Sequence, residues 1–383
     1  MGYVIGQSVV KVGWWKHRIA NPATLLRTFD NPQRINPVNM KAWAGKPTDV
    51  LKLESDYPKP SPAGKKLLVE VHAVALNPVA WKTMGTAPLC WAHKKPAVPE
   101  ADIAGKLVDG DVSGTNLKIG DEVIGFIPYN TIMKHGQGGL AEFTLVESHL
   151  VKKKPANVSF EEAASLPLTA LTAWQALIDT GKLTEADGKR VFINGGSGGV
   201  GAYAVQIAKA FGAYVVTTKS ESSKQLVDSL EPAESIDYKS VNLSRHLAEN
   251  YSGDKAFDIV FDTVGVPELY INCARFIKPS GTFVDIAGPH LGGGVLSAAS
   301  TALSFASKAF LPTFLGGNPF KYNIIMLKGL TMGDEFQQLV DLVAKGTVKP
   351  LVDSTHKFED ALQAYERQMS SRAKGKVIVK VKA

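Results

Sequence analysis

Residues 190–201 read Arg190-Val-Phe-Ile-Asn-Gly-Gly-Ser-Gly-Gly-Val-Gly201, an apolar run that ends in a cluster of glycines. Within it, Gly196-Ser197-Gly198-Gly199-Val200-Gly201 fits the pattern G-x-G-x-x-G. Apolar residues then recur near one face from Val200 to Phe211, which predicts a helix. Strand, glycine turn and helix in this order form the context that a dinucleotide site requires. Glycine lets the backbone approach a pyrophosphate, and the helix N-terminus offers free N–H groups.

The end of the next expected strand bears on which dinucleotide binds. A site for NAD places an acidic residue roughly 20 positions after the first glycine, where it holds the ribose hydroxyls. This chain has Thr217-Thr218-Lys219-Ser220 there, and Glu221 follows. Lys219 and Ser220 can pair with a 2′-phosphate, which an acid would repel. Tyr238, after an expected strand at 235–237, lies where it can cover the adenosine phosphate, although ordinary packing would also explain it. The sequence therefore favours NADPH over NADH.

The hydrophobic period divides the chain into two kinds of structure. From Ser159 onward, strands expected at 190–194, 214–218, 257–262 and 282–286 alternate with helices, which predicts a doubly wound parallel sheet. Between 40 and 150, short strands separated by glycine turns favour a compact, barrel-like domain. The expected fold class is α/β. We expect an extension at 1–39, a β-rich catalytic domain at 40–165, a Rossmann domain at 166–335 and a segment at 336–383 that completes the catalytic domain.

Charge and cysteine content exclude several classes of protein. The formal net charge is +7, but Lys and Arg are scattered along the chain, which argues against a nucleic-acid interface. A phosphorylated cofactor, an anionic membrane surface or a merely solvated surface would each suit mild basicity. The two cysteines, Cys90 and Cys273, exclude a disulfide scaffold and a four-cysteine zinc site. They suit a reducing compartment.

Short motifs follow one another in a fixed order from about residue 40 to the end of the chain. They are Asn77-Pro-Val-Ala-Trp-Lys82, Ala101-Asp-Ile-Ala-Gly105, Gly120-Asp-Glu-Val-Ile-Gly-Phe126, Gly138-Gly-Leu-Ala-Glu-Phe143, Leu166-Pro-Leu-Thr-Ala-Leu-Thr-Ala-Trp174, the glycine loop, Phe257-Asp-Ile-Val-Phe-Asp-Thr-Val-Gly265 and Arg372-Ala-Lys-Gly-Lys376. In this order they resemble the quinone oxidoreductase and enoyl reductase branch of the medium-chain dehydrogenase/reductase superfamily. Within that branch, the chain is most similar to fungal quinone-oxidoreductase-like and reticulon-interacting-protein-like members.

The resemblance implies a GroES-like first domain, a Rossmann second domain and a cleft between them. It implies that Ser197, Gly199 and Val200 hold the pyrophosphate. It implies that Thr172 touches the nicotinamide or its phosphate, and that Asp262, Thr263 and Gly265 line the nicotinamide end. The residues that it places on the substrate side are Asn77, Trp81 and Lys82.

Two positions depart from the family pattern. The usual Asp of the first motif is Ala80, and a glycine often found just before the second motif is Glu100. Both positions belong to the substrate side.

We expect no metal site. Zinc members of the superfamily use Cys and His ligands near the first motif together with a Gly-His-Glu segment, and many add a lobe with four cysteines. The Gly-His-Glu segment and the four-cysteine lobe are both missing from this sequence. Cys90 and His93 form a C-x-x-H pair, but two ligands alone do not make a site. Without a Lewis acid, ionising an alcohol is difficult. Hydride transfer to an already polarised acceptor is then the expected chemistry.

The resulting prediction is an oxidoreductase that uses NADPH to reduce a quinone or the double bond of an enone. Lys82 and Asn77 are the candidate donors to the developing oxyanion, although a solvated lysine and a turn asparagine would also explain them. No residue stands out as the general acid. The competing hypothesis is a non-catalytic, NADPH-binding scaffold or a stress or assembly factor on the same fold.

Two further segments bear on location. Residues 1–29 contain no Asp or Glu and are similar to a weak mitochondrial presequence, although an extension wrapping the first domain would also explain them. Residues 291–315 are apolar but rich in small residues, so we expect a flap beside the active site, or peripheral membrane contact, rather than a membrane span. We expect a cytoplasmic monomer or homodimer, with the mitochondrion or the lipid droplet surface as the alternative location.

Overall fold

The computed structural model describes residues 39–45, 51–85, 96–186, 188–286, 319–325 and 333–382. Three expectations lie outside these residues: the form of the extension before residue 39, the Cys90–His93 pair and the apolar segment at 291–315. Among the described helices, none has the length and apolar character needed to cross a membrane.

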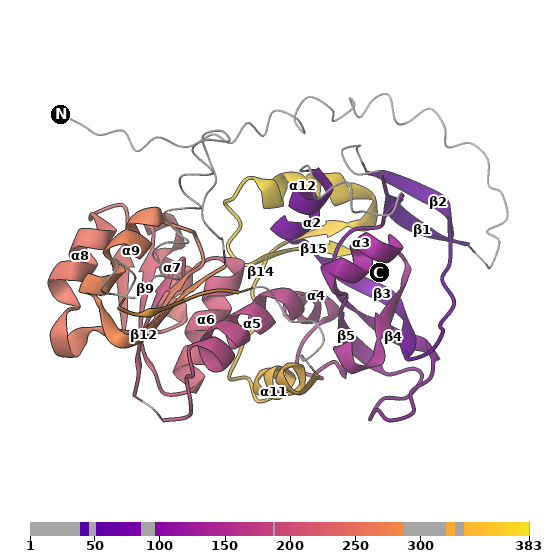
Figure 1. Ribbon diagram of the computed structural model, residues 1–383. Helices are drawn as coiled ribbons and strands as arrows, with labels where there is room; N and C mark the ends of the chain where they lie inside the picture. The colour runs from indigo at the N-terminus through magenta and orange to yellow at the C-terminus, as the bar shows by residue number, and fades with distance from the viewer. Residues whose placement is uncertain are drawn as a thin grey trace.

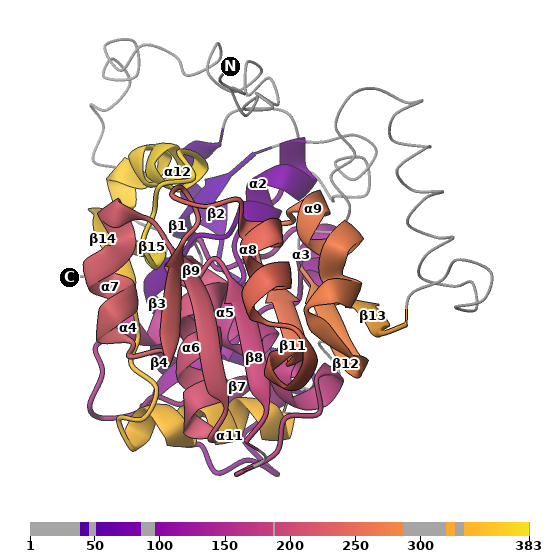
Figure 2. The same ribbon diagram turned by 90° about the vertical axis from the view of Figure 1, so that its left-hand side faces the viewer.

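The second half of the chain forms a parallel sheet of six strands. They are β8 (Arg190–Asn194), β9 (Tyr214–Lys219), β10 (Glu234–Asp237), β11 (Phe257–Asp262), β12 (Ile277–Asp285) and β13 (Lys321–Ile324). Their spatial order is β10-β9-β8-β11-β12-β13, with every neighbouring pair parallel. This is the doubly wound order: the first three strands are added towards one edge of the sheet and the last three towards the other, so the order reverses between β8 and β11. Figure 2 shows β9, β8, β11 and β12 side by side. The expected Rossmann architecture is confirmed.

Helices cover both faces of the parallel sheet. They are α5 (Pro167–Trp174), α6 (Gly199–Ala210), α7 (Lys224–Ser229), α8 (Leu243–Asn250) and α9 (Pro267–Asn272). On the outer face, Phe192, Phe257 and Phe283 share one buried cluster with Leu247 of α8 and Leu269 of α9. On the other face, α6 buries its apolar side in the larger core that continues into the first domain. The central strands β8 and β11 are therefore covered on both sides, which accounts for their nearly continuous apolar sequences.

The first half of the chain forms a mainly antiparallel sheet. Its strands are β3 (Lys66–Ala75), β4 (Asp102–Gly110), β5 (Glu122–Phe126), β6 (Phe143–Glu147), β7 (Val151–Lys153), β14 (Val352–Lys357) and β15 (Lys376–Lys380). Their order is β14-β15-β3-β4-β5-β7, and β6 also pairs with β3. A separate hairpin joins β1 (Asn39–Ala44) and β2 (Lys52–Pro58). Strands β14 and β15 come after the parallel sheet in the chain, so its end lies in the sheet of its first half.

One predicted strand is shorter than expected. The alternation at 140–146 predicts a strand from Leu140, but β6 begins at Phe143. Leu140 instead exchanges backbone hydrogen bonds with two other segments: its carbonyl accepts from Trp43 N, and its N–H donates to Pro99 O. Residues 140–142 therefore bond to β1 and to the segment before β4 in place of continuing β6.

The remaining elements lie around and between the two sheets. They are α2 (Pro78–Gly85), α3 (Tyr129–His135), α4 (Phe160–Ala164), a π-helix (Gln175–Thr180), α11 (Gly333–Ala344), α12 (Ala361–Met369) and 3₁₀ turns at Ser148–Leu150, Glu221–Ser223, Gly253–Lys255, Cys273–Arg275 and Phe358–Asp360. Ser159 and Glu162 form the capping box that the sequence predicts at the start of α4. Figure 1 shows α5 and α6 in the middle of the molecule, between the two sheets.

Specific contacts fix the parallel-sheet domain against the end of the chain. The Tyr203 hydroxyl, on α6, lies 2.7 Å from Ser165 Oγ and accepts a hydrogen bond from Leu351 N. The Gln206 side chain, one turn further along α6, exchanges two hydrogen bonds with the backbone of Lys349. Buried contacts of this kind hold α6 in a fixed place relative to β14 and β15. The N-terminus of α6 is therefore positioned by both domains.

Candidate functional site

The polar residues of the site begin at the carboxyl ends of β8 and β11, where the strand order reverses. Asn194 Nδ2 donates to Asp262 Oδ1 at 2.9 Å, which ties the two strand ends together. Asp262 also accepts hydrogen bonds from the backbone N–H groups of Val264, Gly265 and Val266, at 2.7–3.0 Å. One buried carboxylate therefore orders the whole loop after β11. Ligands of open α/β sheets bind at such a reversal point.

The glycines of the loop after β8 have different physical roles. A Cβ on Gly196 would lie 2.3 Å from Thr217 Oγ1, and a Cβ on Gly201 would lie 2.1 Å from Gly195 O. Both glycines are therefore required by contacts within the protein. A Cβ on Gly198 would meet only Gly195 O, at 3.3 Å. The space beside Gly198 is otherwise open, as a cradle for a phosphate needs.

The N-terminus of α6 opens onto this space. Gly198 is its N-cap, and no side chain caps the helix there, so its first N–H groups are free to bind an anion. A Cβ on Gly199 would lie 3.5 Å from Lys376 Cδ and 3.5 Å from Thr169 Cγ2. Lys376, from β15, thus lies with its aliphatic stem beside the helix start, while its ammonium pairs with Asp102. Backbone amides and the helix dipole both favour a negatively charged ligand here.

The strand after α6 helps to hold the loop. Gly195 N donates to Thr218 Oγ1 at 2.8 Å, and Thr218 Oγ1 donates to Asn194 Oδ1 at 2.9 Å. Thr263 Oγ1 donates to Asn194 O at 2.6 Å. Side chains from β8, β9 and the loop after β11 therefore meet around one turn. Thr263 and Gly265, expected at the nicotinamide end, lie in this network beside Asp262.

The residues expected to choose the cofactor lie at the end of β9. Lys219 Nζ pairs with Asp228 Oδ1 at 2.8 Å, and Lys224 pairs with the same carboxylate at 2.6 Å. Hydrogen bonds from these two lysines lower the pKa of Asp228 to about 2. Lys219 is therefore fixed in direction, and a 2′-phosphate would share it with Asp228. Ser220 Oγ lies 3.1 Å from the hydroxyls of Ser222 and Ser223.

Two neighbours complete the description of this end of the site. Tyr238 follows β10, is 48% exposed and donates its backbone N–H to Lys219 O at 3.2 Å. Its ring is therefore free to lie against a ligand. Lys374, from the loop before β15, donates to Ser222 O across the domain boundary. The sequence motif contains Lys374, but only the fold shows that it lies beside Ser222.

Thr172 lies on α5, which is situated between the two sheets. Its hydroxyl donates to Leu168 O, one turn back, at 2.6 Å, and the side chain is buried. The lone pairs of the hydroxyl remain able to accept a hydrogen bond. Thr172 can therefore bind an amide or another donor of a ligand, but its own proton is already used.

The three residues expected on the substrate side do not share one environment. Asn77 is fully buried, with Nδ2 donating to Asp102 Oδ2 at 3.0 Å and Oδ1 accepting from Lys376. Trp81, on α2, donates from Nε1 to Gln368 Oε1 at 2.9 Å. Lys82 is exposed, and its Nζ lies 5.7 Å from the centre of the Trp81 ring. Asn77 thus belongs to a buried polar cluster, while Lys82 faces solvent.

That buried cluster contains the residues that sequence reasoning missed as site residues. Lys376 Nζ lies 3.2 Å from Asp102 Oδ2, and both side chains are at most 4% exposed. Asp102 Oδ1 also accepts from Leu168 N, at the start of α5. Burial raises the pKa of Asp102, and the Lys376 charge opposes that shift. Asp102 and Lys376 are polar residues of two of the family motifs, Ala101–Gly105 and Arg372–Lys376, and this was the available signal. Nothing in the sequence shows that the two side chains meet.

The metal prediction concerns a limited set of residues. Within the described ranges, no three or more His, Cys, Asp or Glu side chains are grouped so that they could hold a metal ion. Cys273 is a buried free cysteine, whose pKa burial raises. Its thiol is therefore in a poor state to bind a cation.

Known proteins are similar to this chain in both sequence and fold. The family described as alcohol dehydrogenase GroES-like domain matches residues 63–156, and the family described as zinc-binding dehydrogenase matches residues 230–379. A zinc-type alcohol dehydrogenase-like protein of Schizosaccharomyces pombe is 34% identical over 348 residues, which cover 88% of this chain and 96% of that protein.

Two further relatives carry more specific names. The trans-enoyl reductase pgmF of Aspergillus terreus is 30% identical over 362 residues, covering 90% of this chain and 97% of the relative. The mitochondrial NAD(P)H oxidoreductase RTN4IP1 of Bos taurus is 30% identical over 342 residues, covering 82% of each chain.

Solved structures resemble the whole described fold. An alcohol dehydrogenase superfamily protein of Novosphingobium aromaticivorans is 28% identical with a TM-score of 0.74, covering 90% of this chain and 100% of that one. The quinone oxidoreductase of Coxiella burnetii is 25% identical with a TM-score of 0.71, covering 90% and 99%. The expected pairing of a GroES-like and a Rossmann domain is thereby confirmed.

Proposed function

The chain belongs to the medium-chain dehydrogenase/reductase superfamily of oxidoreductases, and from that premise we propose that it is an NADPH-dependent reductase of quinones or α,β-unsaturated carbonyl compounds that works without zinc. The observation that carries the proposal is the open space at Gly198, beside the uncapped N-terminus of α6. These groups fit a dinucleotide pyrophosphate. When bound, the nicotinamide would supply a hydride to the acceptor.

The chain's own residues would divide the remaining work. Ser197, Gly199 and Val200 would hold the pyrophosphate, Gly199 and Val200 through their backbone amides. Gly198 would leave space for it, since its own N–H donates to Gly195 O at 2.9 Å. Asp262 would keep the loop after β11 in place through its three backbone hydrogen bonds, so that Thr263 and Gly265 line the nicotinamide end. Thr172 would accept a hydrogen bond from the ligand on the opposite side. Each of these tasks is positioning, which is what a cofactor enzyme asks of its protein.

The choice of NADPH rests on the end of β9. Lys219 and Ser220 stand where a site for NAD has an acid, and Tyr238 is exposed beside them. Lys374 reaches the same place from the other domain. Asp228 partly neutralises the charge of Lys219, and Lys374 would supply a second positive charge for the 2′-phosphate. The NAD(P)H named for the bovine relative is compatible with this choice.

The choice of acceptor rests on the sequence and on the relatives. The chain lacks the Gly-His-Glu segment and the four-cysteine lobe of zinc members. Two similar proteins are named trans-enoyl reductase and quinone oxidoreductase, whose acceptors are already polarised. Such acceptors take a hydride without a Lewis acid, because their own oxygen can carry the charge.

A screen of the purified, full-length protein tests the proposal. NADPH oxidation is followed by absorbance with a series of quinones and enones, with NADH in parallel and with a chelator present or absent. We expect turnover with at least one acceptor class, preference for NADPH and no effect of the chelator. Tight NADPH binding without turnover of any acceptor would support a scaffold instead, and one stoichiometric zinc by elemental analysis would overturn the zinc-free part.

The cellular location of the protein has two candidates. We propose a cytoplasmic enzyme, and the mitochondrial name of the bovine relative supports the alternative. Imaging the full-length chain against a variant that lacks residues 1–29 would decide between them. Mitochondrial signal that disappears in the shortened variant would establish the alternative and reject the cytoplasm.

A further inference from the structure

Glu100 stands out because neither the fold nor the proposed function explains it. It precedes β4 with φ 71°, in the left-handed region that suits glycine and disfavours a longer side chain. Its side chain is nevertheless fully buried. A strained backbone and a buried carboxyl are both costly, so the contacts that this side chain makes must offset them.

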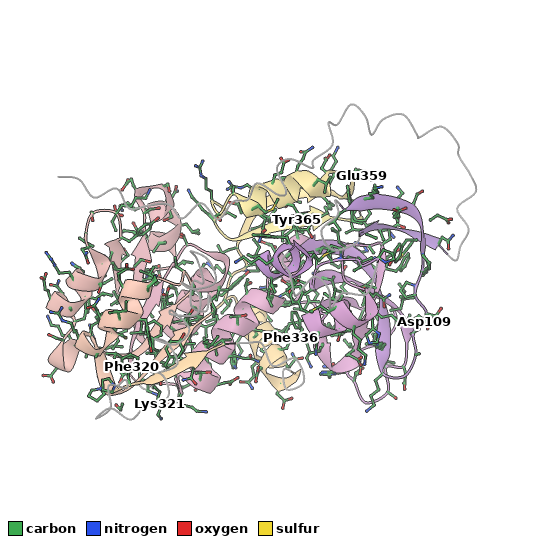
Figure 3. The ribbon with its side chains drawn as sticks, turned by 45° about the horizontal axis from the view of Figure 1, so that its top comes forward. Asp109, Phe320, Lys321, Phe336, Glu359 and Tyr365 are labelled. Carbon is green, nitrogen blue, oxygen red and sulfur yellow. The ribbon has the colours of Figure 1, made fainter. Side chains whose placement is uncertain are left out.

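The Glu100 carboxyl group joins two helices that are far apart in the chain. Tyr365, on α12, donates its hydroxyl to Glu100 Oε1 at 2.6 Å, and Figure 3 labels Tyr365 on that helix. The backbone N–H of Asn77, the residue before α2, donates to Glu100 Oε2 at 3.0 Å. Each oxygen therefore accepts a hydrogen bond from a different helix region, and the carboxyl group holds the two regions together.

The contact with Asn77 fixes the start of α2. Asn77 O accepts from Ala80 N at 3.2 Å, which closes the first turn of the helix. The Asn77 side chain is bound in another direction, to Asp102 and Lys376. Because α2 has only eight residues, it has little stability of its own, and its place depends on the groups that hold it. Glu100 holds its first residue.

A second contact between α2 and α12 lies at Trp81. Its Nε1 donates to Gln368 Oε1 at 2.9 Å. Gln368 follows Tyr365 by three positions on α12, so the two side chains leave the same face of that helix. The Trp81 side chain is only partly buried, and it packs against the core of the protein. The Tyr365–Glu100 and Gln368–Trp81 contacts together fix where the indole ring lies.

We propose that Glu100 is a positioning residue for the acceptor: it holds α2 against α12 and so fixes the Trp81 ring at the place where the acceptor binds. The inference rests on the proposed function and on the assignment of Trp81 to the substrate side. Glu100 acts through Trp81 and takes no part in the bond changes. An aromatic ring that is already held in one orientation binds a flat, conjugated acceptor with a smaller loss of conformational entropy than a mobile ring does. Glu100 should therefore govern the affinity for the acceptor and not the rate of the chemical step.

Removing the side chain tests this role. Glu100→Gly suits the left-handed backbone, so the variant keeps its fold, but it leaves the Asn77 N–H and the Tyr365 hydroxyl without their acceptor. Steady-state kinetics should show a KM for the acceptor that rises about tenfold and a kcat within about threefold of wild type. The dissociation constant for NADPH, measured by fluorescence titration, should stay unchanged.

The conservative variant separates position from charge. In Glu100→Gln the amide oxygen can accept from Asn77 N–H, and the amide N–H can donate to the Tyr365 hydroxyl, which is able to accept. This variant should therefore recover most of the wild-type KM for the acceptor. Tyr365→Phe removes only the contact with α12, so its KM should rise by a smaller factor, about threefold.

The control matches the backbone change in Glu100→Gly. Glu231 is another residue with a left-handed backbone, φ 52°, but it is exposed and lies in the parallel-sheet domain. Glu231→Gly relieves strain of the same kind far along the chain from α2. It should leave the KM for the acceptor unchanged.

A second readout does not depend on turnover. Amide hydrogen exchange of residues 79–84 should be faster in Glu100→Gly than in wild type and should return towards the wild-type rate in Glu100→Gln. Wild-type turnover with an unaltered acceptor KM in Glu100→Gly would overturn the positioning role alone. So would a fall in kcat of about 100-fold in Glu100→Gln, because Glu100 would then act in the chemistry. Absence of wild-type turnover with every acceptor would overturn the proposed function and this inference with it.

Discussion

The glycine loop and the buried cluster behind it deal with charge differently: the loop offers backbone amides to a charged ligand, and the cluster pairs the protein's own charged side chains. The loop around Gly198 offers backbone amides and open space, and it needs almost no side chain. The cluster of Asn77, Glu100, Asp102 and Lys376 consists of side chains that are at most 4% exposed and that come from distant parts of the chain. Lys376 belongs to both regions, because it pairs with Asp102 and also lies beside Gly199.

This difference separates two sources of stability and function. A glycine turn tolerates a ligand because its own hydrogen bonds are local, so a change there should affect binding more than folding. A buried ion pair is held only by the folded state, and removal of one partner leaves the other charge uncompensated. Changes in the glycine loop should therefore lower cofactor affinity, and changes in the buried cluster should lower stability.

The largest effect should come from breaking the buried pair. Lys376→Met leaves Asp102 buried without its countercharge, so we expect a loss of about 3–5 kcal/mol in the free energy of unfolding. Denaturant titration measures it. The control, Lys153→Met, removes a lysine that is 58% exposed from its pair with Asp121 and should cost less than about 1 kcal/mol. Equal losses in the two variants would contradict the contrast.

The same cluster predicts how stability depends on pH. The pKa of Glu100 is raised from 4.5 to about 8 on folding, so the native protein binds more protons than the unfolded chain between these values. Stability should therefore fall as pH rises through this window. Glu100→Gln removes this contribution. Denaturant titrations at several pH values should show a difference between wild type and variant that grows until about pH 8; a constant difference would refute the assignment.

At the glycine loop, the effect should appear in affinity. Gly198→Val places a branched side chain in the open space of the cradle, so we expect cofactor affinity to fall by about 1–3 kcal/mol, or roughly 5- to 160-fold, with little loss of stability. Fluorescence titration with NADPH measures it. Gly333→Val is the control, since Gly333 also stands at a helix start, with only His149 O near its Cβ position at 3.8 Å. A parallel fall in the control would point to damage of folding instead.

The contrast also shows what the sequence can reveal. The glycine loop is a local signal, because its strand, turn and helix are consecutive, and β8 and β11 have the predicted bounds. The parallel sheet followed from the alternation of such segments. The order of the strands and the return of β14 and β15 to the first sheet depend on contacts between distant residues, which no local pattern contains.

The buried cluster was out of reach for the same reason. Lys376 is separated from Asn77 and Asp102 by 299 and 274 positions. Glu100 was visible as a departure from the family pattern, but its left-handed backbone and its partner Tyr365 emerge only from the fold. Sequence reasoning placed Asn77 beside the substrate and did not show that it is enclosed. Burial, and not residue type, is the missing information.

A smaller effect is expected at the adenosine end. Lys219→Ala removes a charged contact to a 2′-phosphate, worth about 1.5–3 kcal/mol in general, and we expect the lower end because Lys219 is shared with Asp228. The preference for NADPH over NADH should then fall about tenfold. Lys224→Ala, which loses the second lysine on the same carboxylate, is the control and should keep the preference. Unchanged selectivity in Lys219→Ala would transfer the role to Lys374.

The smallest effect should come from Lys82, the expected oxyanion donor that faces solvent. Its ammonium lies 5.7 Å from the Trp81 ring, and an exposed charge is screened by water and salt. Lys82→Ala should therefore leave stability and NADPH affinity unchanged and lower kcat by no more than about fivefold. Lys134→Ala, an exposed lysine on α3 of the same domain, should have no effect. Steady-state kinetics at low and high salt distinguishes the alternatives, because screening should shrink the difference between Lys82→Ala and wild type. A loss of kcat beyond about 100-fold would mean that Lys82 contacts the acceptor directly.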